Sequence, residues 1–499
     1  MENIVYCKLK ILPGEQEILV QKGVSLHNAL ANAGYLILSP CGGKGICKKC
    51  KVKLVSGSVD DTVADKDGYI FSCKAKLKED ITVEIPNNIG QGLDVILEPK
   101  TIEDNNGYGI AIDIGTTTIA ACIVDLHNGN VLNRVSCLNP QHIYGADVLS
   151  RIQSSNDGNL SNLQNLVLIK LRELIRILSC DNDIEAIYIS ANTTMLHLLL
   201  GVDPKGIGVY PFTPVFTDEK VIDGTILGLP APKIYILPSV SAYIGADIVS
   251  GVVACDMLDH NKSEMLCDIG TNGEMVLLHR GKMCAVSTAA GPAFEGATIE
   301  CGMLAIAGAI SKVKFVNQEL IYETIDNTSP IGICGSGLID LVAILLREGI
   351  IDENGSFDET NSSTLVERLK EDRLYITEEI YLSQKDIRQI QLAKSAIRAG
   401  IDTLLEEMAL TYNDLSTFYI SGGLAYYMDL HNAAAIGLIP YEIIDIVKLV
   451  GNSSLSGALM CLLDKTCFDK SILLAKKITV RELSFSSRFQ NLFVENMMF

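Results

Sequence analysis

The chain has 499 residues, enough for two to four domains, and a formal net charge of -19 at pH 7. This acidity argues against a general nucleic-acid binder, which needs a basic face, and no apolar run of about 18 residues suggests a membrane span. The 15 cysteines are mostly scattered singly, which is typical of a reducing compartment, and the start lacks the pattern of a signal peptide. We therefore expect a cytoplasmic protein with no nucleic-acid and no membrane partner. The many cysteines and the lack of Trp would suit an anaerobic organism.

The pattern of residues 1–85 predicts short strands around one helix. Alternating apolar residues predict strands at 5–11, 17–20, 51–55 and 81–85. Residues 25–34 begin with a capping serine, carry apolar residues at helical spacing and end on a glycine, so they predict a helix.

Four cysteines in a CxxxxxCxxC…C pattern follow this helix: Cys41, Cys47, Cys50 and Cys73. Such thiolates can bind a small iron–sulfur cluster, because the glycines among them let the backbone curl close and direct N–H groups at its sulfurs. Plant-type [2Fe–2S] sites have nearly this spacing, with one residue fewer between the first two cysteines. Zinc is the alternative, although structural zinc usually uses two separated CxxC pairs, and disulfides fit a reducing compartment poorly. A hairpin, a helix, a metal loop and more strands predict a β-grasp ferredoxin domain over 1–85.

Residues 86–107 are polar and contain several Asn and Gly, and we interpret them as a linker. The pattern then changes to two apolar strands joined by Asp113-Ile-Gly-Thr, and a near copy follows about 155 residues later at Asp268-Ile-Gly-Thr. An internal repeat of this kind predicts two similar α/β lobes that face each other, over 108–260 and 261–499.

The two repeated turns suit a nucleotide. Backbone N–H groups of Gly and Thr in a tight hairpin, together with the hydroxyls, can hold phosphate oxygens. An Asp at the end of each strand can orient Mg²⁺ through water, and also the attacking water. One such turn arises by chance, whereas two of them between strands predict a site for ATP with Mg²⁺. The predicted phosphate-binding residues are Asp113, Gly115, Thr116, Thr117, Thr118, Asp268, Gly270, Thr271, Asn272 and Gly273.

Two glycine-rich patches lie further along the chain. The first contains Gly335 and Ser336, and the second, with Gly422 and Gly423, follows an apolar strand. A strand that runs into Gly-Gly lets a base and a ribose approach the backbone, so we predict that both patches contact the nucleotide. Each patch taken alone is equally well explained as a turn that enters a helix.

These motifs resemble those of the actin-like ATPase superfamily of acetate and sugar kinases, heat-shock chaperones and actin. The repeated turns are similar to its two phosphate loops, and Ser421-Gly-Gly is similar to its adenosine motif. In the sugar kinases of this superfamily the segment before the second phosphate loop holds the catalytic carboxylate, and here that segment contains Asp247. The resemblance implies that Asp247 is catalytic together with Asp113 and Asp268, as a general base or as the group that orients water. The alternative is a buried aspartate that caps a helix.

An iron–sulfur domain joined to an actin-like ATPase resembles the reductive activators of corrinoid proteins, including the activating enzymes of anaerobic O-demethylases. The resemblance extends to polar and glycine clusters at 139–147, 192–197, 287–297 and 451–454. It implies a multidomain α/β fold, with a β-grasp [2Fe–2S] ferredoxin domain followed by a duplicated ribonuclease-H-like fold, that of the actin-like ATPases.

The same resemblance implies a function and its partners. The chain would use ATP to transfer one electron from a [2Fe–2S] cluster to the Co(II) form of a corrinoid protein, which restores Co(I). A low-potential electron donor would be a second partner. Because actin-like lobes often pair, a homodimer is an expected option.

Three other functions combine similar parts. A small-molecule kinase with an accessory ferredoxin domain would turn over ATP only with a metabolite. An activator of a radical dehydratase joins an actin-like ATPase to a [4Fe–4S] cluster that bridges two ATPase domains, and an N-terminal domain with four cysteines of its own argues against it. A simple electron carrier with a vestigial ATPase is disfavoured because both Asp-Ile-Gly-Thr turns are intact.

Overall fold

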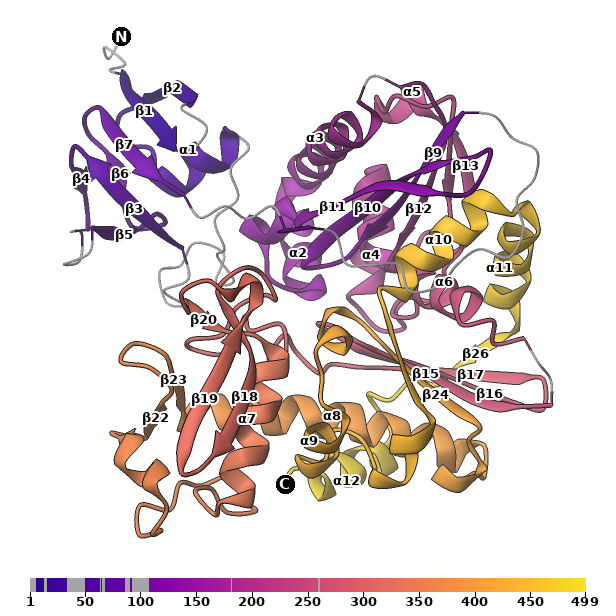
Figure 1. The fold of residues 1–499 in the computed structure, drawn as a ribbon. Coiled ribbons are helices and arrows are strands. Elements are labelled where there is room, and N and C mark those ends of the chain that lie inside the picture. Colours follow the sequence, from indigo (N-terminus) through magenta and orange to yellow (C-terminus); the bar gives the residue numbers. More distant parts are fainter. Residues whose placement is uncertain are drawn as a thin grey trace.

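The structure is a computed structural model that describes residues 6–12, 16–33, 50–62, 64, 68–85, 90–91, 107–180, 182–258 and 261–499. These residues form an N-terminal sheet domain and two larger α/β lobes (Figure 1). Within these ranges, no helix combines the length and the apolar character that a bilayer crossing requires.

The N-terminal domain is built on a five-stranded sheet in the order β2-β1-β7-β3-β5. Leu9 and Ile11 of β1 alternate with more exposed residues and share a buried core with Leu26 and Leu30 of α1. Its elements are β1 (Tyr6–Leu12), β2 (Gln16–Gln21), α1 (Leu26–Asn32), β3 (Lys51–Ser56), β4 (Val59–Asp60), β5 (Tyr69–Phe71), β6 (Lys76–Leu77) and β7 (Ile81–Glu84). A hairpin, a helix and further strands in this order agree with the predicted β-grasp fold.

The first lobe contains a seven-stranded sheet in the order β13-β14-β12-β9-β10-β11-β8. β9, β10 and β11 are antiparallel, and β12 and β14 are added in parallel beyond β9. Its strands are β8 (Gly90–Gln91), β9 (Tyr108–Ile114), β10 (Thr118–Asp125), β11 (Val131–Leu138), β12 (Ile184–Ala191), β13 (Lys220–Asp223) and β14 (Lys233–Ile236). Its helices are η1 (Pro140–Tyr144), α2 (Val148–Ser154), η2 (Ser155–Asn159), α3 (Leu160–Ser179), α4 (Thr193–Leu200), η3 (Lys205–Ile207), α5 (Gly224–Leu227) and α6 (Ala246–Ala254).

The predicted linker is described only in part. Its β8 pairs with Val135 and Ser136 of β11, so this short piece extends the sheet of the first lobe. Residues 86–89 and 92–106 lie outside the described residues.

The second lobe repeats the arrangement of the first. In its six-stranded sheet, β15, β16 and β17 are antiparallel, and β24 and β25 are added in parallel beyond β15. Its strands are β15 (Ser263–Ile269), β16 (Gly273–His279), β17 (Lys282–Thr288), β24 (Thr417–Ser421), β25 (Val447–Gly451) and β26 (Ile478–Val480). The shared strand order explains the internal sequence repeat.

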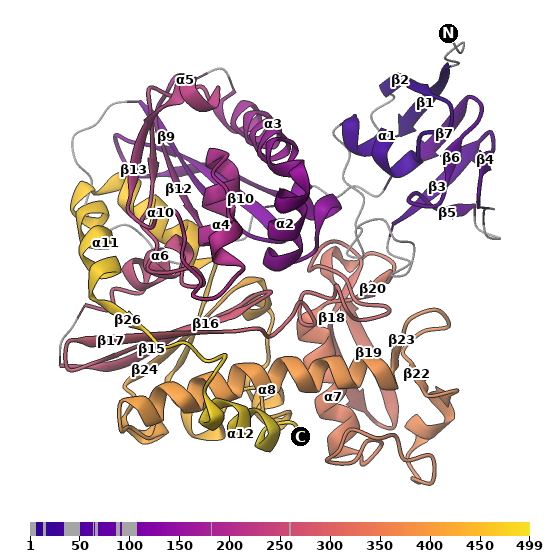
Figure 2. The ribbon, with the colours of Figure 1, turned by 180° about the vertical axis from the view of Figure 1, so that it is seen from behind.

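An insertion between β17 and β24 adds smaller sheets and the longest helix of the described chain. Its elements are β18 (Ala309–Val316), β19 (Glu319–Thr324), η4 (Ile325–Asn327), β20 (Gly332–Ile333), α7 (Gly335–Arg347), η5 (Thr364–Arg368), β21 (Leu369–Lys370), β22 (Arg373–Tyr375), β23 (Tyr381–Ser383), α8 (Gln384–Glu407) and η6 (Tyr412–Asp414). Figure 2 shows α8 running from the sheet of β15 to β17 toward α7. After β24 follow η7 (Gly423–Tyr426), α9 (Leu430–Ala435) and η8 (Tyr441–Ile446).

The chain returns to the first lobe through α10 (Ser453–Leu463) and α11 (Lys465–Lys477). Their apolar residues belong to the same buried core as β9 and β12 of the first lobe. α10 crosses α6 at very short range, since a Cβ added to Gly457 would lie 2.1 Å from the carbonyl oxygen of Ser250. The predicted division at 260/261 stays a prediction, but 453–477 pack with the first lobe.

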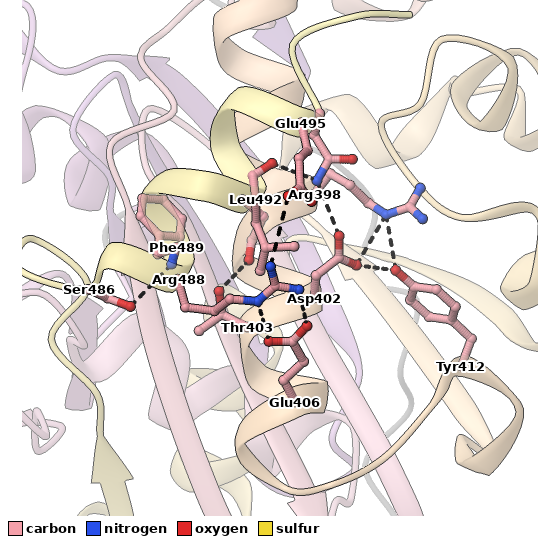
Figure 3. Close-up of polar contacts among 12 residues, drawn as sticks. Arg398, Asp402, Thr403, Glu406, Tyr412, Ser486, Arg488, Phe489, Leu492 and Glu495 are labelled. Carbon is pink, nitrogen blue, oxygen red and sulfur yellow. Dashed lines mark hydrogen bonds and ion pairs between the residues drawn. The ribbon is translucent and has the colours of Figure 1, made fainter.

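The last helix, α12 (Ser487–Glu495), is fastened to α8 by polar contacts (Figure 3). Arg488 donates two hydrogen bonds of 2.8 and 2.5 Å to the carboxylate of Glu406. Asp402 accepts hydrogen bonds from Arg398 at 3.3 Å, from Asn496 at 3.2 Å and from the hydroxyl of Tyr412. Asp402 is thus the shared acceptor of this contact.

Replacing Asp402 with Ala is expected to lower the free energy of unfolding by about 1–3 kcal/mol, because three buried or half-buried donors lose their acceptor. Glu495→Ala is the control, since the Glu495 side chain is 62% exposed and its ion pair with Arg488 is 3.9 Å long. Urea unfolding followed by circular dichroism measures both variants. Equal losses in the two variants would contradict the central role of Asp402.

Candidate functional site

A cleft of about 260 Å³ is lined by residues of both lobes. Its walls come from the turns after β9 and β15, the start of α7, the segment after β24 and the start of α10. The predicted nucleotide-binding and catalytic residues that line it are Asp113, Gly115, Thr116, Thr117, Thr118, Asp247, Asp268, Gly270, Thr271, Asn272, Gly335, Ser336, Gly422 and Gly423. The structure therefore brings together segments that lie far apart in the sequence.

Gly273 is the predicted residue that does not line this cleft. It is the first residue of β16, and a Cβ there would lie 2.7 Å from Thr288 Oγ1 and 3.2 Å from Ile397 Cγ1. Gly273 thus allows β16 to pack closely against β17 and α8, inside the second lobe. The motif alone did not indicate on which side of the turn its last glycine lies.

The two aspartates of the repeated turns are each held by side chains from elsewhere. Asp113 accepts hydrogen bonds from Asn452 Nδ2 at 2.8 Å and from Ser454 Oγ at 2.7 Å, both at the start of α10. Asp268 accepts a hydrogen bond of 2.5 Å from Ser421 Oγ at the end of β24. Fixed carboxylates at matching places in the two lobes are suited to orient a hydrated cation.

The turn after β9 is held by hydrogen bonds from side chains outside the turn. Asn139 Nδ2 donates to the carbonyl oxygen of Gly115 at 2.8 Å, and Asn192 Nδ2 donates to Thr116 Oγ1 at 3.0 Å. Arg151 is fully buried and donates to the carbonyl oxygens of Thr116 at 2.5 Å and Gly145 at 3.0 Å. Burial lowers the pKa of Arg151 to about 9. These bonds fix the shape of the turn before any ligand binds.

Glu295 joins the two turns. Its Oε2 accepts a hydrogen bond of 2.8 Å from Thr117 Oγ1 and one of 2.7 Å from Thr271 Oγ1. The two hydroxyl oxygens lie 3.3 Å apart. One carboxylate oxygen therefore links the first lobe to the second.

Several lining residues were not predicted as site residues, including Asn192, Glu274, Glu295, Tyr427, Asn452 and Ser454. Four of them lie in the polar and glycine clusters that carried the family resemblance, which was the signal that could have found them. Glu274 directly follows the predicted Gly273, and this adjacency could have indicated it, whereas nothing local in the sequence distinguishes Tyr427.

The charged side chains that line the cleft are all carboxylates: Asp113, Asp247, Asp268, Glu274 and Glu295. Among the described residues no Lys or Arg lines it. Burial raises the pKa of Asp113 to about 6 and, with the charges of Asp268 and Asp113, raises the pKa of Asp247 to about 8. A cleft with this lining favours a ligand that brings its own cation.

Asp247 does not cap its helix. The N-cap of α6 is Gly245, and Asp247 lies in the first turn of α6, where its Oδ1 accepts the N–H of Ile248 at 2.9 Å. Its carboxyl group lines the cleft, so the structural alternative considered above does not account for its position.

The stability of the nucleotide-free protein is expected to fall as the pH rises from 6 to 8. The carboxyl groups of Asp113 and Asp247 have a higher pKa in the folded chain than their ordinary value of 3.8. Folding is therefore favoured while both groups are protonated. Their contribution is therefore full below about pH 4 and is lost as the pH rises through about 6 and about 8 respectively. The slope is on the order of 1 kcal/mol per pH unit.

Urea unfolding at pH 6, 7 and 8 measures this dependence, and Asp247→Asn is expected to flatten it between pH 7 and 8. An unchanged slope in that variant would mean that Asp247 is not the group that takes up the proton.

Cys50 and Cys73 are the predicted cluster ligands that the structure describes, and their sulfurs lie 3.1 Å apart. A disulfide bond is about 2.0 Å long, so these two thiols converge without forming a disulfide. The N–H of Ser72 donates to the carbonyl oxygen of Cys50 at 2.8 Å, which holds the two segments together. Converging thiols of this kind fit two ligands of one iron–sulfur cluster. Cys41 and Cys47 lie outside the described residues.

His27 of α1 lies beside this site. Its Nδ1 is 3.1 Å from the hydroxyl of Ser72, the neighbour of Cys73. Burial and, to a smaller extent, the charge of His142 in η1 lower the pKa of His27 to about 4. His27 therefore links α1 to the segment that carries Cys73.

Three family descriptions match consecutive parts of the chain. Residues 9–78 match a 2Fe-2S iron-sulfur cluster binding domain, 108–260 match the RACo middle region, and 262–499 match the C-terminal domain of RACo, the ASKHA domain. The ASKHA match and the repeated lobes confirm the predicted actin-like ATPase fold, and the first match confirms the predicted ferredoxin domain.

A solved structure named reductive activator for corrinoid,iron-sulfur protein has 30% sequence identity and a TM-score of 0.74, over 99% of this chain and 98% of that chain. The corrinoid activation enzyme RamQ of Eubacterium limosum is 34% identical over 427 residues, which are 80% of this chain and 72% of that protein. This chain belongs to the family of reductive activators of corrinoid proteins.

A second relative of this activator is the [Co(II) methylated amine-specific corrinoid protein] reductase of Methanosarcina barkeri. It is 28% identical over 433 residues, which are 78% of this chain and 76% of that protein. The relatives thus include proteins named for acting on different corrinoid proteins.

Proposed function

We propose that this activator uses ATP to reduce a corrinoid protein, passing one electron from a [2Fe–2S] cluster to Co(II) and so restoring Co(I). The observation that carries the proposal is that one chain contains both converging cysteine thiols and a cleft between two lobes. This chain is similar over nearly its whole length to a reductive activator. The phosphate turns in this cleft come one from each lobe.

The cleft is proposed to bind ATP with Mg²⁺. The turns after β9 and β15 supply hydroxyl groups to one cavity, and the acidic lining requires that phosphates enter with a cation. Asp113 and Asp268, each fixed by a serine hydroxyl, would hold Mg²⁺ through water. Asp247 would orient the attacking water or take its proton, so that ATP is hydrolysed.

Four cysteines are proposed to hold the cluster: Cys41, Cys47, Cys50 and Cys73. When bound, a plant-type cluster supplies single electrons at a potential near about -400 mV. Co(I) is a stronger reductant than that, and each ~59 mV uphill lowers a one-electron equilibrium constant tenfold. ATP is the proposed source of the difference, through closure of the two lobes about the α6–α10 contact and a changed grip on the Co(II) protein.

The test is an anaerobic mixture of the activator, a Co(II) corrinoid protein, a low-potential reductant and Mg-ATP, followed by the absorbance of Co(I). Co(I) is expected to accumulate faster and further with ATP than with ADP or without nucleotide. Equal reduction with and without ATP would contradict the coupling. ATP turnover that needs an added metabolite, and not the corrinoid protein, would favour a small-molecule kinase.

A further inference from the structure

The carboxylate of Glu295 lies where the two phosphate turns meet. Its Oε2 takes one hydroxyl donor from the first lobe, Thr117, and one from the second, Thr271, at 2.8 and 2.7 Å. The hydroxyl oxygen of Thr116, by contrast, accepts a hydrogen bond from Asn192 Nδ2. Thr117 and Thr271, one hydroxyl from each turn, therefore both donate to one anionic side chain.

The backbone around Glu295 holds this side chain in place. Gly296 has a φ of +76°, and a Cβ there would lie 2.3 Å from the backbone nitrogen of Met303. Met303 lines the cleft, and its N–H donates to the carbonyl oxygen of Ile333 at 2.9 Å. The tight turn at Gly296 therefore sets Glu295 into the cleft from the segment between β17 and β18.

A carboxylate and a phosphate compete for such a position. Both are anions whose oxygens accept hydrogen bonds from hydroxyl groups, and one pair of donors at this distance serves one acceptor. No Lys or Arg among the described lining residues could neutralise a phosphate beside Glu295, and the guanidinium of Arg151 is occupied by carbonyl oxygens behind the turn. A phosphate that accepts hydrogen bonds from these two hydroxyls must therefore displace the carboxylate.

We propose that Glu295 occupies the γ-phosphate position of the nucleotide-free protein and makes the cleft discriminate between ATP and ADP. The proposal rests on the proposed function, in that the cleft binds ATP. Gly422 and Gly423, which are predicted to bind the base, belong to the second lobe. Thr117 and Thr271 lie where the turns of the two lobes meet. The terminal phosphate would lie at this meeting point. ATP replaces Glu295 at both hydroxyls, whereas ADP leaves this link between the lobes in place.

The test uses calorimetry on the full chain with its cluster. It compares the dissociation constant of Mg-ADP with that of Mg-AMPPNP, in which AMPPNP is a non-hydrolysable ATP analogue. Glu295→Ala is expected to bind AMPPNP about tenfold more tightly and ADP within about twofold of the unchanged protein, because only the γ-phosphate competes with Glu295. Glu295→Gln keeps an acceptor for both hydroxyls but lacks the charge, so a smaller gain for AMPPNP is expected.

Glu274→Gln is the matched control, because it makes the same carboxyl-to-amide change in the same cleft, whereas the two threonine hydroxyls are held by Glu295. It is expected to shift both affinities by a similar factor. In the Glu295 variants, equal shifts for both nucleotides or weaker binding of AMPPNP would overturn the proposal. If Glu295→Ala does not fold, Glu295→Gln decides by the same criterion. Failure of the unchanged protein to bind either nucleotide would instead overturn the proposed ATP site.

Discussion

Replacing Cys50 with Ser is expected to abolish Co(I) formation while ATP turnover persists. Cys50 is 1% exposed, and its sulfur lies 3.1 Å from that of Cys73, the other proposed ligand that the structure describes. A serine hydroxyl is a poor substitute for a thiolate at iron, so the visible absorbance and the electron paramagnetic resonance signal of the cluster should be lost. Reduction of the corrinoid protein should fall to the level of the reductant alone.

Cys180→Ser is the control for this experiment. Cys180 is an exposed free cysteine at the end of α3, far along the chain from the proposed ligands, and its loss should leave the cluster and Co(I) formation unchanged. A Cys50→Ser protein that retains both the full cluster signal and Co(I) formation would show that Cys50 is not a ligand.

Asp247→Asn is expected to lower ATP turnover by roughly 10²–10⁴-fold, the usual contribution of a general base. Asparagine keeps the size of the side chain and can still accept the N–H of Ile248, but it cannot take a proton from water. Nucleotide binding should be retained, because the amide has the size of the carboxyl group, whose pKa burial raises to about 8. Phosphate release measures turnover, and calorimetry with AMPPNP measures binding.

Asp157→Asn makes the same chemical change at an exposed position of the first lobe and should leave turnover unaltered. Turnover in Asp247→Asn within about threefold of the unchanged protein would remove Asp247 from the catalytic role. A parallel measurement of Co(I) formation in this variant tests whether binding of ATP suffices or whether hydrolysis is needed.

The N-terminal domain was largely predictable because its signals are local. Alternating apolar residues predicted β1 and β7, and the capping serine before α1 is found at its N-terminus, where Ser25 Oγ accepts the N–H of Asn28 at 3.2 Å. The repeated Asp-Ile-Gly-Thr turns were equally visible, since each lies between two apolar strands of seven or eight residues.

The partners of these turns were not predictable from local pattern. Asn452 and Ser454 hold Asp113 across 339 and 341 residues of sequence. Glu295 lies 178 residues from Thr117, although one hydrogen bond joins them. No periodicity or spacing rule relates positions so far apart, because their contact depends on how the two lobes are packed.

The sequence by itself determined the cysteine pattern, the two phosphate turns and the strands around them, since these depend on neighbouring residues and on backbone conformation. Only the tertiary structure decided which way each side chain of the turns points. In the tertiary structure, Gly273 packs inside the second lobe, and residues 453–477 pack with the first lobe. The carboxylate of Glu295 accepts hydrogen bonds from the hydroxyls of Thr117 and Thr271. The physical reason is that close packing and the pairing of buried polar groups are satisfied across the whole molecule.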